Sequence, residues 1–271
     1  KGNLWFSTWD GINRFNGYSF KTYKARQGNF ISLTNNRVDR MYEDPDGFLW
    51  LLTYDNRAHR FDPRTETFEQ VPAAGQPGSN SNVNAISVLR RGTVWLLTEN
   101  DGAIRVTASA QTGRLATKVF KVYQDADNNE WLLTDNGLGL IRPGEKTPVS
   151  YFVETKERFS DPKQAFYAVQ ENETEICFGS DRGRVWRYQK ENGQFELLEL
   201  PTRSRISSIN SVEPNKVVIA TSTDGFFVYN LKTKEYVHYS HVTCRDLPSA
   251  PIVSAYVDKT SEVWFEQEEP G

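Results

Sequence analysis

A short apolar pattern centred on tryptophan recurs along the chain. The stretch GNLWFSTWDGINRF at 2–15 returns in similar form at 47–61, 92–105 and 130–138. Two weaker copies carry Cys177 and Val218 in place of the tryptophan, and the last copy contains Trp264. The seven anchors, at 5, 50, 95, 131, 177, 218 and 264, have a mean period of about 43 residues. That period is typical of four-stranded propeller blades or of helical-repeat arrays.

The pattern inside each copy favours strands. Ahead of the tryptophan lies a run such as Val38–Glu43 or Ile252–Val257, which alternates apolar and polar residues or is β-branched. Turns with a central glycine, such as Asp46-Gly47 and Asp224-Gly225, recur at intervals of about ten residues. Each copy is therefore predicted to hold four antiparallel strands. The third and fourth are expected at 12–16 and 19–23 in the first copy, and at 226–230 and 235–239 in the sixth.

Such sheets must pack face to face around an axis to bury their apolar faces, which predicts an all-β propeller of four-stranded antiparallel blades. We expect seven blades, the first and last incomplete; the alternative is six blades followed by the start of a second propeller. The single domain at 1–271 would divide at 1–30, 31–76, 77–116, 117–160, 161–202, 203–246 and 247–271. The charged segment 154–165 is expected to form a loop or one helical turn between blades.

The tryptophans suit this architecture, because bulky aromatic rings fill the wedge between neighbouring blades. We assign that role to five of them and place Trp186 on the third strand of the fifth blade, which leaves Trp9 without a packing role. The five are Trp5, Trp50, Trp95, Trp131 and Trp264.

Composition excludes several classes of protein. The 271 residues hold 32 Lys and Arg against 35 Asp and Glu, so a net charge of −3 disfavours nucleic-acid binding through bulk charge. The longest aliphatic run, Val217–Ala220, is far shorter than the roughly 20 residues of a membrane span. Cys177 and Cys244 are expected to be free, one as a small buried apolar residue and the other as a loop thiol; a single disulfide between them is the alternative. Because the chain begins at Lys1, directly before the first repeat, we interpret it as a piece of a longer protein.

The repeat consensus is Asp-x-x-Gly-x-Leu-Trp-x-x-Thr-x-x-Gly-Leu-x-Arg-Phe, and it resembles the regulator-propeller repeat in periplasmic sensors of hybrid two-component systems. Arg14–Phe20 resembles the first blade of such sensors, whereas the fifth and sixth copies depart from the motif by losing the tryptophan. The resemblance implies periplasmic location in a protein anchored in the inner membrane. It also implies partner domains in the same chain (a second propeller, a β-sandwich, a membrane helix and a cytoplasmic histidine kinase) and a homodimer of the full sensor. Such sensors detect oligosaccharides and switch on genes for polysaccharide use.

The turns between the second and third strands are the candidate ligand site, because they converge with the loops that enter each blade. A polar turn has no packing reason to carry a large aromatic, whereas a sugar ring stacks on one while carboxylates and amides bind its hydroxyls. Trp9 and Tyr54 are therefore predicted to form a carbohydrate or partner platform. The alternative is that they pack against the next blade or a second propeller. The candidate residues are Trp9, Asp10, Tyr54, Asp55, Glu99, Asn100, Asp135, Asn136, Asp181 and Arg182, with Thr223 and Asp224 at the sixth turn.

No catalytic residue, metal site or cofactor is predicted. Most aspartates occupy turn positions, where the carboxylate caps backbone N–H groups, and 44–47 lacks the downstream glutamate of a calcium loop. His238 and His241 point to opposite faces of a strand, and no histidine falls on the predicted ligand face. The sequence thus favours a ligand sensor that is not an enzyme. A propeller lyase or glycosidase and a structural or protein-docking propeller are the alternatives.

Overall fold

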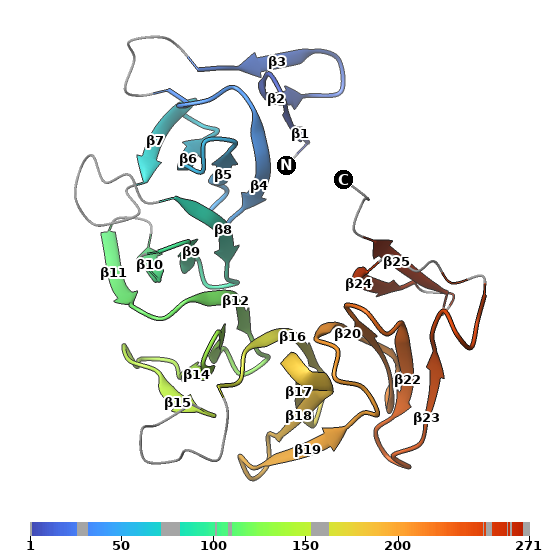
Figure 1. Ribbon diagram of the computed structural model, residues 1–271. Helices are drawn as coiled ribbons and strands as arrows, with labels where there is room; N and C mark the ends of the chain where they lie inside the picture. Colours follow the sequence, from blue (N-terminus) through green and yellow to red (C-terminus); the bar gives the residue numbers. More distant parts are fainter. Residues whose placement is uncertain are drawn as a thin grey trace. The chain divides into compact units, whose positions relative to one another are not determined.

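The computed structural model describes residues 2–25, 32–71, 82–100, 102–107, 110–152, 163–245, 247, 251–258, 260 and 262–267. Within these residues the chain forms seven antiparallel sheets and no α-helix (Figure 1). Five sheets have four strands, the first has three and the last has two. In every sheet the strands lie in chain order, so each pairs with the next. This is the predicted all-β propeller architecture, with incomplete first and last blades.

The chain divides into two compact units, Lys1–Gln124 with Gly144–Lys146, and Asp125–Pro143 with Thr147–Gly271. The first sheet contains β1 (Leu4–Thr8), β2 (Gly11–Phe15) and β3 (Phe20–Tyr23). The second contains β4 (Val38–Glu43), β5 (Leu49–Thr53), β6 (Ala58–Asp62) and β7 (Thr67–Val71). The third contains β8 (Val83–Val88), β9 (Val94–Thr98), β10 (Ala103–Thr107) and β11 (Ala110–Leu115).

The fourth sheet contains β12 (Val119–Gln124), β13 (Glu130–Thr134), β14 (Gly137–Ile141) and β15 (Val149–Tyr151). In the fifth, β16 (Phe166–Glu171) and β17 (Glu175–Ser180) are followed by a short 3-10 turn, η1 (Asp181–Gly183), then β18 (Arg184–Gln189) and β19 (Phe195–Glu199). The sixth contains β20 (Ile206–Glu213), β21 (Lys216–Thr221), β22 (Phe226–Asn230) and β23 (Tyr236–Tyr239). The seventh contains β24 (Ile252–Val257) and β25 (Val263–Gln267).

The predicted strands agree closely with the observed ones. β4, β22 and β24 have the predicted bounds, β3 and β23 begin one residue later than predicted, and β2 lies one residue earlier at both ends. Several predicted blade limits, among them 30/31 and 76/77, lie outside the described residues, so these divisions stay predictions. Of the expected loop or turn at 154–165, only 163–165 are described, and they form neither helix nor strand.

A threonine closes the turn after the second strand of most sheets. The Thr98 hydroxyl donates a 2.7 Å hydrogen bond to the Gly102 carbonyl, and Thr134 makes the same 2.8 Å bond to Gly137. Buried hydroxyls need such partners, so the threonine that ends each apolar strand in the sequence also fixes the turn that follows. The equivalent bonds join Thr8 to Gly11, Thr53 to Arg57 and Thr221 to Gly225.

An aspartate holds the central tryptophan of a sheet from the preceding turn. Asp44 Oδ1 accepts hydrogen bonds from the backbone N–H of Asp46 and Phe48, as predicted for a capping carboxylate, and Oδ2 accepts one of 2.9 Å from Trp50 Nε1. The turn and the indole are thus satisfied by one side chain. Asp125 with Trp131 and Asp258 with Trp264 repeat the arrangement at 2.9 and 3.0 Å.

Trp5, Trp50 and Trp131 pack between neighbouring sheets of one unit, as predicted. Trp5 contacts Phe61 of the second sheet at 5.6 Å between ring centroids, and Trp131 contacts Phe178 of the fifth at 4.8 Å. Trp50 lies in a core shared by the second and third sheets, and Trp95 is also buried. The prediction is wrong for Trp264, whose side chain is 60% exposed. Its sheet has two strands in the described residues.

The fifth and sixth sheets lack a tryptophan on the second strand and fill that position with smaller side chains. Cys177 on β17 is 2% exposed, and Val218 on β21 is fully buried. Both cysteines are free thiols, Cys177 buried and Cys244 partly exposed, in agreement with the sequence analysis.

Candidate functional site

A repeated hydrogen bond places the predicted ligand turns. In each case the first residue of the turn donates its backbone N–H to the carbonyl of a residue just before the first strand of the same sheet. The bonds run from Tyr54 to Arg37 (3.0 Å), Glu99 to Asn82 (3.2 Å), Asp181 to Ala165 (2.9 Å) and Ser222 to Arg205 (2.9 Å). The turn and the entering loop therefore meet at one end of each sheet, as the sequence analysis expects.

Arg37 joins the two aromatic residues that the sequence singles out. Its guanidinium carbon lies 4.6 Å from the ring centroid of Trp9 in the first sheet and 4.2 Å from that of Tyr54 in the second. Cation–π attraction at these distances holds both rings against one charge. Trp9 is nevertheless 79% exposed and Tyr54 58% exposed, so the rings offer most of their surface to solvent. Trp9, Arg37 and Tyr54 are called the aromatic platform below.

The backbone around Arg37 is fixed from both sides. The N–H of Gly11 donates to the Asn36 carbonyl at 2.6 Å, and the Asn36 side chain accepts from the N–H of Ala25 at 2.8 Å. Arg37 itself is held by Asp39, with 2.8 Å between Nε and Oδ1. Gly11 has φ +98°, and a Cβ there would lie 2.1 Å from the Tyr23 carbonyl oxygen, so only glycine allows this turn. The platform is therefore preorganised by the fold.

Two buried polar atoms belong to Asp55, in the same turn as Tyr54, and to His59, on the strand that follows the turn. His59 is fully buried on β6, and its Nε2 lies 2.9 Å from the hydroxyl of Thr34. Among the described residues, His59 Nδ1 and Asp55 Oδ1 have no hydrogen-bond partner. Burial lowers the pKa of His59 to about 4, opposed by the charge of Asp55 and reinforced by that of Arg57. The imidazole is therefore neutral at physiological pH.

The remaining predicted residues stay at their own turns. Asp10 pairs with Lys24, and Asp135 pairs with Lys163 at 2.7 Å. Asp181 accepts a long hydrogen bond of 3.3 Å from the N–H of Ala165. Asn136 donates its N–H to the Thr134 hydroxyl. The side chains of Glu99 and Asn100 are exposed, and among the described residues they make no hydrogen bond or ion pair.

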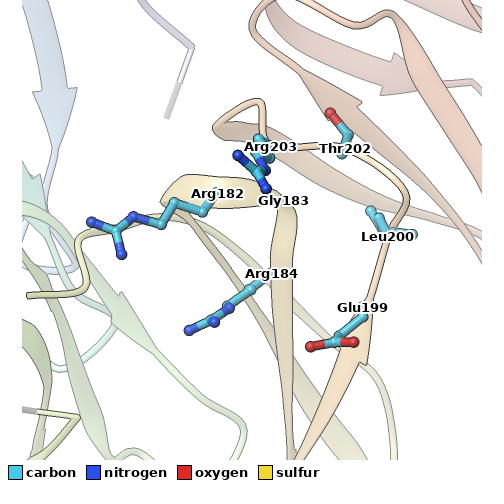
Figure 2. Close-up of a pocket in the computed structure, with 7 residues that line it drawn as sticks. All are labelled: Arg182, Gly183, Arg184, Glu199, Leu200, Thr202 and Arg203. Carbon is cyan, nitrogen blue, oxygen red and sulfur yellow. The ribbon is translucent and has the colours of Figure 1, made fainter. Parts of the chain in front are cut away.

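Arg182 belongs to a different environment from the other predicted residues. With Gly183, Arg184, Glu199, Leu200, Thr202 and Arg203 it lines a cavity of about 680 Å³ at the end of the fifth sheet (Figure 2). Sequence reasoning missed Arg37, Arg184 and Arg203. No local signal marks these arginines, because their importance comes from segments that meet only in the fold.

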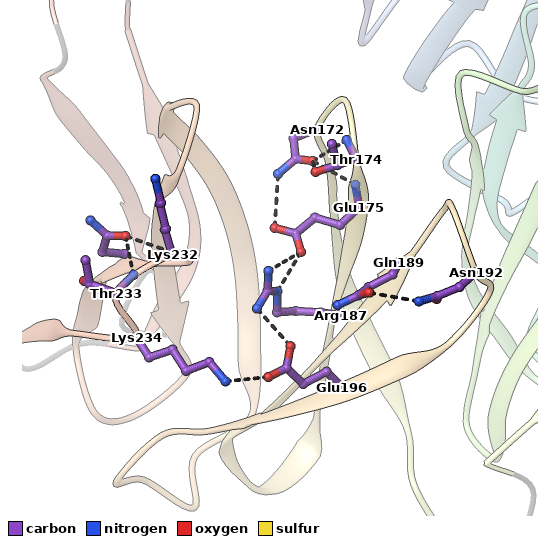
Figure 3. A network of polar contacts seen from close by, with 11 residues as sticks. Asn172, Thr174, Glu175, Arg187, Gln189, Asn192, Glu196, Lys232, Thr233 and Lys234 are labelled. Carbon is purple, nitrogen blue, oxygen red and sulfur yellow. Dashed lines mark hydrogen bonds and ion pairs between the residues drawn. The ribbon is translucent and has the colours of Figure 1, made fainter.

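A second cluster of charged side chains, centred on Arg187, has a structural role. Arg187 binds Glu175 at 2.7 Å and Glu196 at 3.0 Å, and Glu196 also binds Lys234 of the sixth sheet at 2.6 Å (Figure 3). The hydrogen bond from Lys234 lowers the pKa of Glu196 below its usual value. Because these charges satisfy one another, the network links two sheets and leaves no free charge for a ligand.

Metal-binding clusters and membrane-spanning helices are both absent from the described residues. These residues contain no group of three or more His, Cys, Asp or Glu side chains placed to bind a metal ion. They also contain no helix of the length and apolar character that would span a membrane.

One repeat of the chain matches a known protein family. Residues 32–55 match the family model described as two component regulator propeller. The match covers β4, the Trp50 strand and the turn with Tyr54 and Asp55. Residues 32–55 thus carry one two-component regulator propeller repeat. No curated protein matches the sequence.

Solved structures share the propeller fold of this chain. The extracellular domain of a putative hybrid two component system from B. thetaiotaomicron is 20% identical, with TM-score 0.61, over 98% of this chain and 38% of that one. A second such domain from the same organism is 15% identical, with TM-score 0.51, over 98% and 42%. The computationally designed Ika8 protein is 14% identical, with TM-score 0.61, over 96% and 76%. The chain thus spans about two fifths of the length of these two extracellular domains.

Proposed function

We propose that this chain is the extracytoplasmic ligand-sensing propeller of a hybrid two-component system and that it senses an oligosaccharide. It lies in the periplasm as part of a protein anchored in the inner membrane, and it acts by binding rather than by catalysis. The regulator-propeller match at 32–55 and the extracellular domains with the same fold support the sensing role. The other domains, including a second propeller and a β-sandwich, and the dimer of the full sensor are part of this proposal.

The aromatic platform is the observation that supports an oligosaccharide as the ligand. Stacked sugars need a flat apolar ring that is already held in place, and Arg37 holds the rings of Trp9 and Tyr54 while both stay exposed. The carboxylates of Asp10 and Asp55 lie in the same two turns and are suited to sugar hydroxyls. Glu99 and Asn100, at the third sheet of the same unit, offer further polar groups for a longer ligand.

The test is calorimetric titration of neutral oligosaccharides against the wild-type chain and a Trp9→Ala/Tyr54→Ala double variant. We expect the double variant to lose at least tenfold in affinity, because each stacking contact contributes about 1 kcal/mol. Tyr18→Ala is the matched control, since Tyr18 is 97% exposed but lies in the turn at the opposite end of the first sheet.

The competing functions give different outcomes in the same experiment. Unchanged affinity in the double variant would exclude the platform as the sugar site. If chromatography of the mixture shows that the oligosaccharide is cleaved, a lyase or glycosidase would be favoured. Absence of binding to any saccharide would favour a structural or protein-docking propeller.

A further inference from the structure

A cavity of about 680 Å³ lies at one end of the fifth sheet, in the second unit of the chain. One wall is the turn that joins β17 to β18, with Arg182, Gly183 and Arg184. The other wall is the end of β19 and the segment leading to β20, with Glu199, Leu200, Thr202 and Arg203. This volume is within the range of small-molecule sites and is many times the roughly 30 Å³ share of a water molecule.

The lining of the cavity carries unbalanced positive charge. Three arginines and one glutamate line it, although the whole chain has a net charge of −3. Arg184 and Glu199 occupy facing positions on β18 and β19, yet their charged groups form no ion pair. In the part of the chain that the structure describes, the side chains of Arg182, Arg184 and Arg203 have no hydrogen-bond or ion-pair partner. Arg187, three residues after Arg184 on β18, by contrast forms ion pairs with Glu175 and Glu196.

The backbone holds this arrangement at some conformational cost. Arg182 has φ +64° and ψ +29°, the left-handed region that non-glycine residues rarely adopt. The following residue, Gly183, has φ +70°, and a Cβ there would lie 2.1 Å from the carbonyl oxygen of Thr202. The two walls therefore approach as closely as glycine permits. Backbone strain that a fold retains is concentrated at binding sites, where it fixes the positions of functional side chains.

The Thr202 wall is fixed as well. The Thr202 hydroxyl accepts a 3.0 Å hydrogen bond from the N–H of Ser204, and the Ser204 hydroxyl lies 2.8 Å from that of Thr223 in the sixth sheet. The segment that carries Arg203 is thus tied to the neighbouring sheet, so the arginine-lined cavity is formed before any ligand arrives. Preformed sites bind with less loss of conformational entropy.

We propose that this cavity is a second ligand site, distinct from the aromatic platform, that binds an acidic sugar through its carboxylate or sulfate group. Guanidinium forks recognise carboxylate and sulfate-like oxyanions by paired charge-assisted hydrogen bonds, and three unpaired forks supply more donors than a neutral sugar requires. The volume accommodates one or two sugar rings in addition to the anion. The anionic part of this ligand rests on the cavity alone; the sugar part rests on the proposed sensing function.

The test measures binding of four probes to the wild-type chain by calorimetry: digalacturonate, glucose 6-sulfate, glucose and inorganic sulfate. We expect the two acidic sugars to bind more tightly than glucose and than inorganic sulfate, with affinity that falls as salt increases. Whichever acidic sugar binds more tightly identifies the anionic group. Equal binding of inorganic sulfate and glucose 6-sulfate would overturn the proposal, because the site would then be an adventitious ion site only.

Variants assign the binding to this cavity. Arg182→Gln and Arg184→Gln should each weaken acidic-sugar binding about tenfold or more, since a hydrogen bond to a charged group is lost. Arg205→Gln is the matched control: it removes the same charge from the segment that carries Arg203, but Arg205 stacks on Tyr167 and does not line the cavity. Glu199→Gln should strengthen binding severalfold, a gain that damage to the fold cannot produce.

The outcomes separate this site from the platform. Acidic-sugar binding that is unchanged in Arg182→Gln and Arg184→Gln, or absent from the wild-type chain, would overturn the proposal. Retention of acidic-sugar binding in the Trp9→Ala/Tyr54→Ala variant supports two independent sites. Loss of acidic-sugar binding in that variant, with circular dichroism unchanged, would place the anion at the platform and refute a separate cavity.

Discussion

At the scale of single residues, the carboxylate of Asp44 accepts three hydrogen bonds, which join the turn to the central tryptophan of the sheet. It accepts two backbone N–H groups and the indole N–H of Trp50, all within the second sheet. Removing it leaves buried donors without an acceptor, which is more costly than losing an exposed hydrogen bond.

We predict that Asp44→Ala lowers the free energy of unfolding by about 1–3 kcal/mol. Asp46→Ala, in the same turn, should change it by less than about 0.5 kcal/mol, because that side chain is exposed. Urea unfolding followed by tryptophan fluorescence measures both. Equal effects of the two substitutions would contradict a special role for Asp44.

His59 makes the stability of the fold depend on pH. Its pKa falls to about 4 in the folded chain from 6.5, because burial disfavours the charged ring. Between pH 6.5 and about 4 the unfolded chain binds a proton on this ring that the folded chain does not bind. Stability is therefore fully present above pH 6.5 and is lost as the pH falls toward 4, in total by about 3 kcal/mol at most.

We expect the melting temperature of the wild-type chain to fall more steeply between pH 7 and pH 5 than that of His59→Gln. The slope is the measurement of interest, since the substitution also shifts stability at every pH. Parallel curves for the two proteins would show that His59 does not titrate in this way.

At the scale of strands and turns, the first sheet provides a direct test of why its turns contain glycine. Gly11 and Gly17 have nearly the same φ, +98° and +96°, so alanine is strained at both positions. A Cβ on Gly11 meets the Tyr23 carbonyl at 2.1 Å, whereas one on Gly17 meets nothing within 4 Å.

Gly17→Ala should therefore cost about 1 kcal/mol of stability, the value of the backbone strain alone. Gly11→Ala should cost clearly more and should also reduce the contact between Arg37 and the Trp9 ring, visible as a change in near-ultraviolet circular dichroism. If the two substitutions destabilise equally, steric contact does not decide this turn.

At the scale of the whole molecule, the redox state follows from where the two cysteines lie. Cys177 is 2% exposed, and burial raises its pKa to about 12, so it is a poor nucleophile in the folded chain. Cys244 is partly exposed and free. A thiol reagent such as DTNB should react with one cysteine in the native protein and with two in denaturant.

A reductant should leave the melting temperature unchanged, because no disulfide is present to stabilise the fold. Detection of no reactive thiol in denaturant, together with a melting temperature that falls in reductant, would support the alternative disulfide between Cys177 and Cys244.

Sequence periodicity predicts most of the fold because its causes are local. The Trp50 strand, the capping Asp44 and the closing threonine all lie within one repeat, so each repeat specifies its own sheet. The exception is informative: Trp264 has the same local motif and the same aspartate bond, but the packing of its ring depends on a neighbouring surface, and the ring is exposed.

The sequence by itself determined the repeat, the bounds of several strands to within one residue, the buried tryptophans of the complete sheets and the two aromatic residues that stand out at the turns. The tertiary structure alone decided that Arg37 lies between Trp9 and Tyr54 and that Arg182, Arg184 and Arg203 line one cavity. The physical reason is range. Strand period and turn chemistry act over a few residues, whereas a site is formed by side chains from separate turns whose positions depend on how sheets and loops pack.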